Sequence, residues 1–388
     1  MANRKRGNGE GSISHRSNGR WRAQVYQDTG RRISRDFKTK PEAQSWLRQM
    51  QGELEQGFDY QGSKTLLKDY LHDWLDTARI ALRPKTADSY KRTMQKHIVP
   101  QLGEIPMKDL KPIHVEKFYV RLVEAGVGVR TIRLVHTILH RALERAVFQM
   151  LLIRNPSAHA TLPQYRHGEM KVLDEIQVNQ FLVTAIDSPY VALYHLAVKT
   201  GMRQGEILGL KWSDLQWGSG RLYVQRQLQD VRGMGSFFQE PKTRSGRRTI
   251  QLGARTLQAL MEHHEFQQTQ KVFASQRWQD NELIFPSKLG TPLSPSNLRL
   301  DFNRVLERAG VPKIRFHDLR HTAASLMLNN GIPVIVVSRI LGHSKPSITL
   351  DIYGHLYNEM QEEAARLMDE LVSPIKVNLP SNVINAVP

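Results

Sequence analysis

The chain of 388 residues contains no cysteine. This absence excludes disulfide bonds, thiolate nucleophiles and zinc sites built on cysteine. The sequence also has no apolar run near the roughly 18 residues that a membrane-spanning helix requires. Residues 1–6 are largely basic and lack the apolar stretch of a secretory signal, so we expect a cytoplasmic protein without a membrane partner.

Acidic residues are comparatively scarce. The chain carries 37 aspartates and glutamates against 55 lysines and arginines, which gives a formal net charge of +18. Such an excess favours a polyanionic partner, for which nucleic acid is the usual choice. We therefore expect a DNA-binding protein associated with the nucleoid. The length suffices for two or three domains, and the 40% of hydrophobic residues supports ordinary packed cores.

Residues 1–58 are predicted to form a small basic domain. Residues 1–48 contain twelve lysines and arginines against four acidic residues. Three segments within residues 11–37 are expected to be short strands, because apolar and polar side chains alternate there, and a helix should follow from Thr39. A three-stranded sheet with one helix can enter a DNA major groove, although a basic appendage without a specific role fits the composition too. The candidate DNA contacts are Arg20, Arg22, Arg31 and Arg32.

Residues 64–160 are predicted to be entirely helical, with apolar residues such as Tyr70 and Trp74 at helical spacing. A linker should follow over residues 158–171. The last domain is expected to span residues 172–372, and residues 373–388 form an apolar tail with few charges. Candidate DNA contacts in the helical domain, each of which also suits a merely solvated position, are Lys85, Thr86, Tyr90, Lys91 and Arg133.

The last domain holds residues suited to binding a phosphodiester. Phosphoryl transfer requires neutralisation of the non-bridging oxygens and a nucleophile in line with the leaving oxygen. Arginine suits the first task, because its planar fork donates two hydrogen bonds and keeps its charge. Arg203 follows Gly201, a predicted helix terminator, and stands at the expected start of a new helix. Glu206 shares that helix face and is expected to orient Arg203, although the pair alone could be an ordinary surface ion pair.

A second group of candidates lies in the segment His317-Asp318-Leu319-Arg320. On a helix His317 and Arg320 share a face, which makes Arg320 a second candidate phosphate ligand. His317 is the candidate acceptor of the nucleophile's proton, because the ordinary pKa of histidine lies near neutrality. His321 points about 100° away from Arg320 and is expected to be structural.

His343 and Tyr353 complete the set, ten residues apart. His343 follows a predicted apolar helix, a position where histidines also serve as simple caps. A free tyrosine has a pKa of about 10 and is a weak nucleophile at pH 7. Neighbouring cations such as Arg203 and Arg320 would favour its phenolate. Tyr357, one helical turn later, is the alternative nucleophile.

Residues 222–225 and 249–252 are predicted to pair as a β-hairpin. Between them lie Lys242, Arg244, Arg247 and Arg248. We expect the three arginines to contact the DNA backbone. Lys242 is a candidate catalytic residue, and the alternative is that it only contacts the DNA backbone.

The ordered set of Arg203, Lys242, the His317–Arg320 box, His343 and Tyr353 resembles the catalytic signature of the tyrosine recombinases, the phage integrase family. The resemblance covers nearly the whole chain and is strongest over residues 172–360. It implies a multidomain, mainly α fold with small β-sheets. Its parts would be a three-stranded-sheet-plus-helix head that binds arm-type DNA sites, a helical domain that binds core sites, and a mixed α+β catalytic domain.

The resemblance also implies roles for these residues. Arg203 and Arg320 would bind the scissile phosphate, His343 would hydrogen-bond it, and Lys242 would protonate the departing 5′-oxygen. Tyr353 would attack to form a 3′-phosphotyrosine. No metal, cofactor or ATP is expected in this chemistry.

The implied function is site-specific recombination that integrates and excises a mobile element or prophage through a Holliday junction. The implied partners are double-stranded DNA with core and arm attachment sites, further protomers in a tetramer, an accessory DNA-bending protein and an excision factor. In relatives the segment after the tyrosine packs on a neighbouring protomer, which would suit the apolar tail. Two alternatives are a type IB topoisomerase, which religates the same strand, and a DNA-binding regulator without catalysis.

Overall fold

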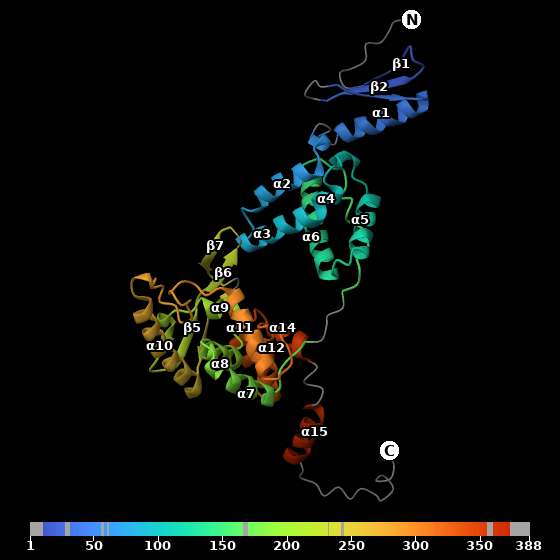
Figure 1. Cartoon of the computed structure of the whole chain (residues 1–388). Coiled ribbons are helices and arrows are strands. Elements are labelled where there is room, and N and C mark those ends of the chain that lie inside the picture. Colours follow the sequence, from blue (N-terminus) through green and yellow to red (C-terminus); the bar gives the residue numbers. More distant parts are fainter. Residues whose placement is uncertain are drawn as a thin grey trace, which may run out of the picture. The chain divides into compact units, whose positions relative to one another are not determined.

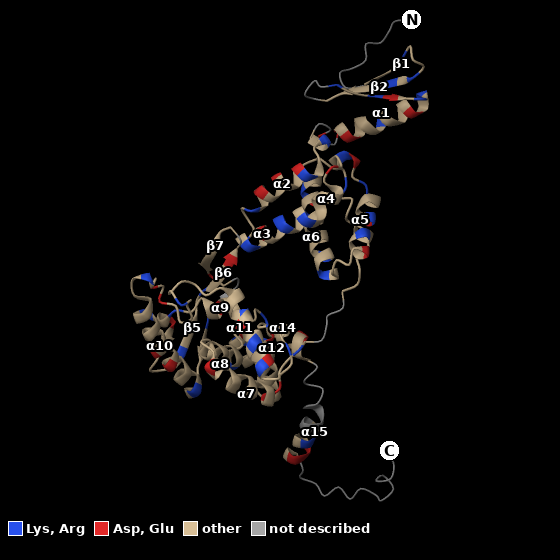
Figure 2. Ribbon diagram, in the orientation of Figure 1, with Lys and Arg blue, Asp and Glu red and all other residues tan. Residues whose placement is uncertain are grey.

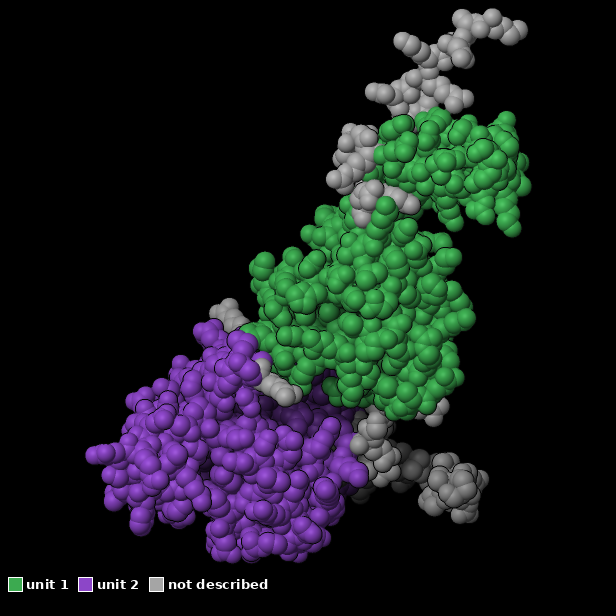
Figure 3. All heavy atoms as spheres, turned by 45° about the horizontal axis from the view of Figure 1, so that its top comes forward, with its two compact units in different colours: residues 1–167 green, residues 168–388 purple. Residues whose placement is uncertain are grey.

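The computed structural model describes residues 11–27, 32–55, 58–59, 62–165, 170–231, 233–241, 244–354 and 360–372. The chain forms two compact units, Met1–His167 and Gly168–Pro388 (Figure 3). Both units are mainly helical and carry small antiparallel sheets (Figure 1), which confirms the predicted fold class. None of the described helices is long and apolar enough to cross a membrane.

The first unit begins with an antiparallel sheet in the order β1 (Ser12–His15), β2 (Trp21–Tyr26), β3 (Arg32–Phe37), followed by helix α1 (Lys40–Glu55). Successive side chains on a strand point to opposite faces. Val25 and Ile33, which face each other across β2 and β3, are therefore buried together with Met50 of α1. The three predicted strands and the helix are confirmed.

A helical bundle follows, and its long last helix contributes more buried residues than any other helix of the bundle. Seven residues of that helix, spaced three or four apart as an apolar face requires, are buried. Prolines open two of the other helices, Pro84 and Pro112, at positions where the missing N–H costs nothing. The helices are α2 (Leu67–Ala78), α3 (Pro84–Thr93), a π-helical turn (Met94–Ile98), α4 (Val99–Leu102), α5 (Pro112–Glu124) and α6 (Val129–Phe148).

The second unit surrounds one large apolar core. Phe181, Tyr194 and Phe302 meet there at ring-centroid distances of 5.2 to 5.9 Å. Its helices are α7 (Glu175–Thr184), α8 (Val191–Thr200), α9 (Gln204–Leu208), α10 (Ala254–Ala274), α11 (Pro295–Arg308), α12 (Asp318–Asn329), α13 (Val334–Leu341), α14 (Pro346–Tyr353) and α15 (Met360–Leu371). Short 3₁₀ turns lie at Gly62–Lys64, Met107–Asp109, Ala185–Asp187, Trp212–Asp214, Arg244–Gly246 and Ser275–Arg277.

The strands of the second unit form two sheets. One has the order β4 (Leu215–Gln216), β5 (Arg221–Val224), β8 (Arg248–Gln251), and the other pairs β6 (Gln227–Val231) with β7 (Gly235–Gln239). The predicted pairing of β5 with β8 is confirmed, but the prediction of a simple hairpin is wrong. A second hairpin lies between the two strands. Its turn contains Gly233 and its second strand begins at Gly235, and both glycines have positive φ.

Gly201 fixes the junction between α8 and α9. Its φ of +60° lies in the left-handed region, where a side chain is strained. A Cβ there would also lie 2.5 Å from a methyl group of the buried Leu341 and 3.3 Å from Ala323. The absence of a side chain thus lets α12 and α13 pack close to the turn that precedes Arg203.

Replacement of this glycine should cost more than replacement of an unhindered one. Gly310 has nearly the same φ, +64°, and no atom lies within 4 Å of the place that a Cβ would take, so Gly310→Ala should lose only the conformational term, about 1–2 kcal/mol. Gly201→Ala adds the overlap with Leu341 and should lose measurably more. Urea unfolding of both variants checks this, and equal losses would contradict the packing argument.

Candidate active site

A buried carboxylate organises the first part of the site. Glu206 is 2% exposed, and its two oxygens accept from Arg203 Nη1 at 2.7 Å and from the Arg203 backbone N–H at 3.0 Å. Burial alone would raise the pKa of this carboxyl, but the charges and hydrogen bonds of Arg248 and Arg203 together hold the pKa below its ordinary value. Glu206 therefore remains an anion that fixes Arg203 at the start of α9. The Arg203 side chain is still 39% exposed and can reach a ligand.

Arg248 is the second partner of this carboxylate. Its side chain is 7% exposed and donates to Glu206 Oε2 at 2.9 Å, to the Ile340 carbonyl at 2.6 Å and to the Gly246 carbonyl at 3.2 Å. The expectation that Arg248 contacts the DNA backbone is therefore wrong, because its donors are turned into the protein. It ties α9, β8 and the end of α13 together.

Arg320, on α12, lies near Arg203, Glu206 and Arg248. It is 4% exposed, its Nη1 donates to the Gly201 carbonyl at 2.9 Å, and its Nη2 has no partner among the described residues. Burial and then the charge of Arg203 lower its pKa to about 9, so it stays charged at pH 7. A buried guanidinium with an unused donor is costly without an anion. The arrangement of Arg203 and Arg320 thus suits an incoming phosphate oxygen.

His317, directly before α12, and His321, in the first turn of α12, lie close together. The rings of His317 and His321 are 5.4 Å apart and nearly perpendicular. His317 stands just before the helix with part of its ring in solvent, yet the surrounding protein lowers its pKa to about 4, first by desolvation and then through the charges of His321 and Arg320. His317 is therefore neutral at pH 7 and able to accept or donate one proton.

Tyr353 is buried at the end of α14. It is 1% exposed and packs with Ala324, Leu328 and Leu341. Its Oη lies 2.7 Å from Nδ1 of His321. Burial raises the phenol pKa to about 12, against the opposing effect of Arg320. His321, which the sequence pattern assigns a structural role, is therefore in hydrogen-bond contact with the candidate nucleophile.

His343 connects the site to α14. Its Nδ1 lies 2.8 Å from Oγ1 of Thr349, which is fully buried. Desolvation, followed by the charges of Arg320 and Arg203, lowers the His343 pKa to about 4. The contact with Thr349 occupies Nδ1, so Nε2 is the ring nitrogen that remains for a contact with a substrate. Thr349 was not predicted, although it lies four residues before Tyr353, on the same helix face.

Some candidates of the second unit lie beyond the part that the structure describes. Lys242 and Tyr357 are outside the described residues, as is the side chain of Arg244. Arg247 is exposed and pairs with the exposed Glu240. The structure brings together Arg203 at the start of α9, His317 and Arg320 at the start of α12, His343 between α13 and α14, and Tyr353 on α14. Burial first, and then the charges of neighbouring groups, lower the pKa values of His317, Arg320 and His343.

The candidate DNA contacts of the first unit differ in what the fold leaves accessible. Arg20, Arg32, Lys85, Lys91 and Arg133 are exposed, and Thr86 is half-buried. Figure 2 shows lysines and arginines along several helices of this unit. Arg31 lies outside the described residues.

Two of these candidates have partners within the fold. Tyr90 is 6% exposed and stacks on Trp74 at 6.3 Å, so its predicted DNA contact is wrong. Arg22 pairs with Asp36 directly across the sheet at 2.6 Å, which offsets its charge. Residue type predicts both contacts, but it carries no information about the stacking of Tyr90 on Trp74 or the pairing of Arg22 with Asp36.

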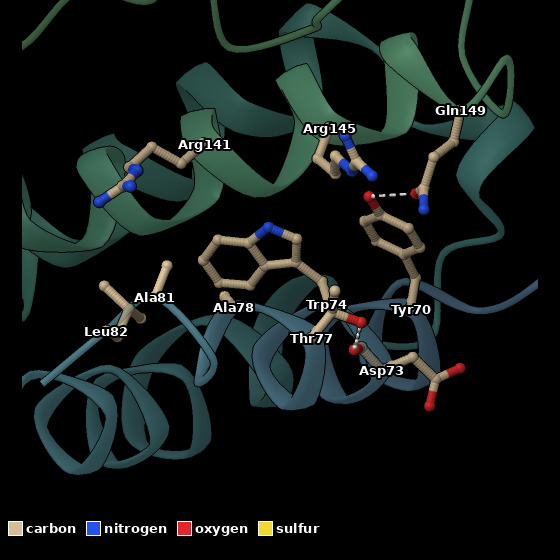
Figure 4. A pocket seen from close by; sticks show the side chains of 10 residues that line it. All are labelled: Tyr70, Asp73, Trp74, Thr77, Ala78, Ala81, Leu82, Arg141, Arg145 and Gln149. Carbon is tan, nitrogen blue, oxygen red and sulfur yellow. Dashed lines mark hydrogen bonds between the residues drawn. The ribbon is translucent and has the colours of Figure 1, made fainter. Parts of the chain in front are cut away.

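A hollow of about 500 Å³ lies between α2 and α6 (Figure 4). The ring of Trp74 forms part of its wall, and Tyr70 donates from its hydroxyl to Gln149 at 3.1 Å. Arg141 and Arg145 project from α6 above it. These two arginines extend the positive charge of the helix that also carries Arg133.

Within the described ranges, no group of three or more histidine, aspartate or glutamate side chains could hold a metal ion. The cluster around Tyr353 consists instead of guanidiniums, imidazoles and the buried carboxylates of Glu206 and Asp318, which are both paired with arginines. Such a set is suited to binding an anion next to a phenol.

Residues 171–360 match the model of the phage integrase family, and residues 66–123 match that of the phage integrase N-terminal SAM-like domain. The chain belongs to the phage integrase family. A XerC-like tyrosine recombinase of Caldanaerobacter subterraneus is 29% identical, with 89% of this chain and 93% of the relative covered. An integrase of Streptomyces ambofaciens is 27% identical, with 94% and 97% covered.

Solved structures of integrases have the same fold. A Tn1549 transposon integrase in complex with circular intermediate DNA superimposes with a TM-score of 0.67 at 21% identity, covering 78% of this chain and 99% of that one. A lambda integrase dimer bound to a core site gives 0.56 at 19% identity, covering 91% and 96%. The integrase described here is thus a tyrosine site-specific recombinase.

Loss of Arg248 should damage both stability and chemistry. Arg248→Met leaves the buried Glu206 with one counter-charge, and breaking a buried pair typically costs about 3–5 kcal/mol. Urea unfolding measures this loss, and covalent DNA-adduct formation should fall because Arg203 and the end of α13 lose their tie.

The neighbouring Arg247→Met is the matched control, because its exposed pair with Glu240 should change stability by less than about 0.5 kcal/mol. Adding Glu206→Gln to Arg248→Met should recover part of the stability, since no buried charge is then left short of a partner. A double variant as unstable as Arg248→Met would contradict the electrostatic explanation.

Proposed function

We propose that this integrase integrates and excises a mobile DNA element or prophage by strand exchange through a 3′-phosphotyrosine intermediate and a Holliday junction. The observation that carries the proposal is the unused Nη2 of the buried Arg320, which adjoins Arg203, His343 and the Tyr353 phenol. A phosphodiester would satisfy this donor and bring its phosphorus next to the tyrosine.

The chemistry follows from the charges. Arg203 and Arg320 neutralise the non-bridging oxygens of the scissile phosphate, and His343 donates from Nε2 while Thr349 holds Nδ1. Tyr353 attacks the phosphorus and passes its proton to His317, the acceptor that the sequence predicts. The bond to the 5′-oxygen breaks, and Lys242 protonates that oxygen. Two guanidiniums and an ammonium supply the charge that a divalent metal provides in other phosphoryl-transfer enzymes, so the reaction needs neither metal nor ATP.

The phosphotyrosine keeps the energy of the broken phosphodiester. The free 5′-hydroxyl of a partner DNA can therefore attack it and release the tyrosine. One such exchange gives a Holliday junction, and a second gives recombinant duplexes.

The assembly is proposed from the family. Two protomers bind each core site and a tetramer joins two sites, as in the solved lambda integrase structures, which include a dimer on a core site and a tetramer on a Holliday junction. The sheet domain of residues 1–58 binds arm sites, and an accessory DNA-bending protein and an excision factor set the direction. The tail of residues 373–388 packs on a neighbouring protomer.

Covalent trapping tests the nucleophile. Wild type, Tyr353→Phe and Tyr357→Phe are incubated in EDTA with nicked suicide substrates carrying the attachment-site core, and adducts are resolved on denaturing gels. We expect an adduct with wild type and Tyr357→Phe and none with Tyr353→Phe. An adduct lost only in Tyr357→Phe would move the nucleophile by one helical turn, and an adduct that requires Mg²⁺ would contradict metal-free chemistry.

Deletion of residues 1–58 tests the sheet domain. The truncated chain should still cleave core DNA but recombine a long attachment site poorly, as measured by product formation from two duplexes. Full recombination by the truncated protein would refute arm binding. Relaxation of supercoils without exchange between duplexes, by the intact protein, would instead indicate a topoisomerase.

A further inference from the structure

The hydrogen-bond partner of the Tyr353 phenol is an imidazole that the proposed mechanism does not use. His321 Nδ1 lies 2.7 Å from Tyr353 Oη, with the two ring centroids 5.9 Å apart. A neutral phenol donates, so Nδ1 of His321 accepts, and the remaining ring proton of a neutral imidazole sits on Nε2. This is the geometry of a general base in contact with its nucleophile.

The surroundings keep His321 able to accept a proton. Desolvation lowers its pKa most, Asp318 opposes this, and Arg320 and Arg315 lower it further. The other titratable groups that face it are His317 at 5.4 Å, His343 and the phenol itself. His321 is thus uncharged at pH 7, and its Nδ1 lone pair is available.

The phenol needs such a base. Burial raises its pKa to about 12, and the charge of Arg320 offsets only part of this. Once a phosphate oxygen binds Arg320, that charge is partly neutralised and helps the phenolate less. A proton acceptor in direct contact removes the need to form a free phenolate before attack.

We propose that His321 is a further catalytic residue, which takes the Tyr353 proton during strand cleavage and returns it during strand joining. The inference rests on the proposed function. As the O–H bond of Tyr353 breaks, an N–H bond forms at His321, the phenolic oxygen bonds to phosphorus and the P–O5′ bond breaks. The 5′-oxygen takes its proton from the general acid of the proposed mechanism. His317, at the start of the helix, then serves the phosphate and not the phenol.

Single-turnover cleavage by the full-length protein tests this assignment. His321→Asn is the informative variant, because Oδ1 of asparagine can occupy the place of Nδ1 and hold the phenol without being basic. We expect cleavage of a nicked core-site duplex to fall by about 10²–10⁴-fold with unchanged DNA affinity. His321→Ala should fall similarly and regain rate with added imidazole, which fits the space left by the ring.

A second substrate distinguishes a general base, the role proposed for His321, from a general acid, the role proposed for Lys242. In a duplex with sulfur in place of the bridging 5′-oxygen, the leaving group needs no proton. Lys242→Ala should therefore regain rate on the sulfur substrate, whereas His321→Asn should remain slow. Wild type should lose rate as pH falls through the His321 pKa, below the ordinary 6.5, and His321→Asn should lack this acid limb.

Several outcomes would overturn the inference. His321→Asn cleaving at the wild-type rate would show that the contact has no catalytic role. Faster cleavage by His321→Asn or His321→Ala would show that the hydrogen bond inhibits the reaction by holding the tyrosine in its buried position. Rescue of His321→Asn by the sulfur substrate would make His321 part of the acid pathway. Loss of the adduct in the His321 variants together with an adduct from Tyr353→Phe would refute the proposed nucleophile and not this step alone.

Discussion

The active site depends on one buried carboxylate held between two guanidiniums. Glu206 accepts from Arg203 and Arg248, and Arg248 also binds the carbonyl of Ile340 at the end of α13. An isolated buried carboxylate would protonate, but two cations keep it charged. Through this anion, α9, β8 and α13 are fixed against each other. Arg203 stands at the start of α9, the segment that contains Lys242 ends at β8, and His343 follows α13.

Most of the other ionisable groups of the site are positively charged guanidiniums or imidazoles that stay neutral. Arg320 keeps a donor unused, and His317 and His343 have their pKa values lowered to about 4 by burial and by nearby cations. Such a site is unfavourable without an anion and becomes favourable with one. An anion such as a DNA phosphate would therefore complete the cluster electrostatically.

The position of Tyr353, the proposed nucleophile, follows from packing more than from charge. Thr349 and Tyr353 lie on the inner face of α14, where one contacts His343 and the other His321. The spacing of His317 and His321, four residues apart, already places two imidazoles on one helix face. The spacing from Arg320 alone does not reveal this, since His321 does point away from that residue along the helix. The tertiary fold brings α14 to the face that the two histidines share.

The sequence by itself determined the class of chemistry, the mainly helical fold and most element boundaries, because glycine and proline act locally and apolar spacing reflects helix and strand geometry. Gly201 and Gly342 end their helices at positive φ, and α1 begins at Lys40, next to the predicted start at Thr39. Only the tertiary structure decided that Arg248 faces inward, that Tyr90 is buried and that His321 meets Tyr353. Each of these depends on contacts between residues far apart in the chain, and side-chain type and local spacing carry no information about which distant partner a buried group will find.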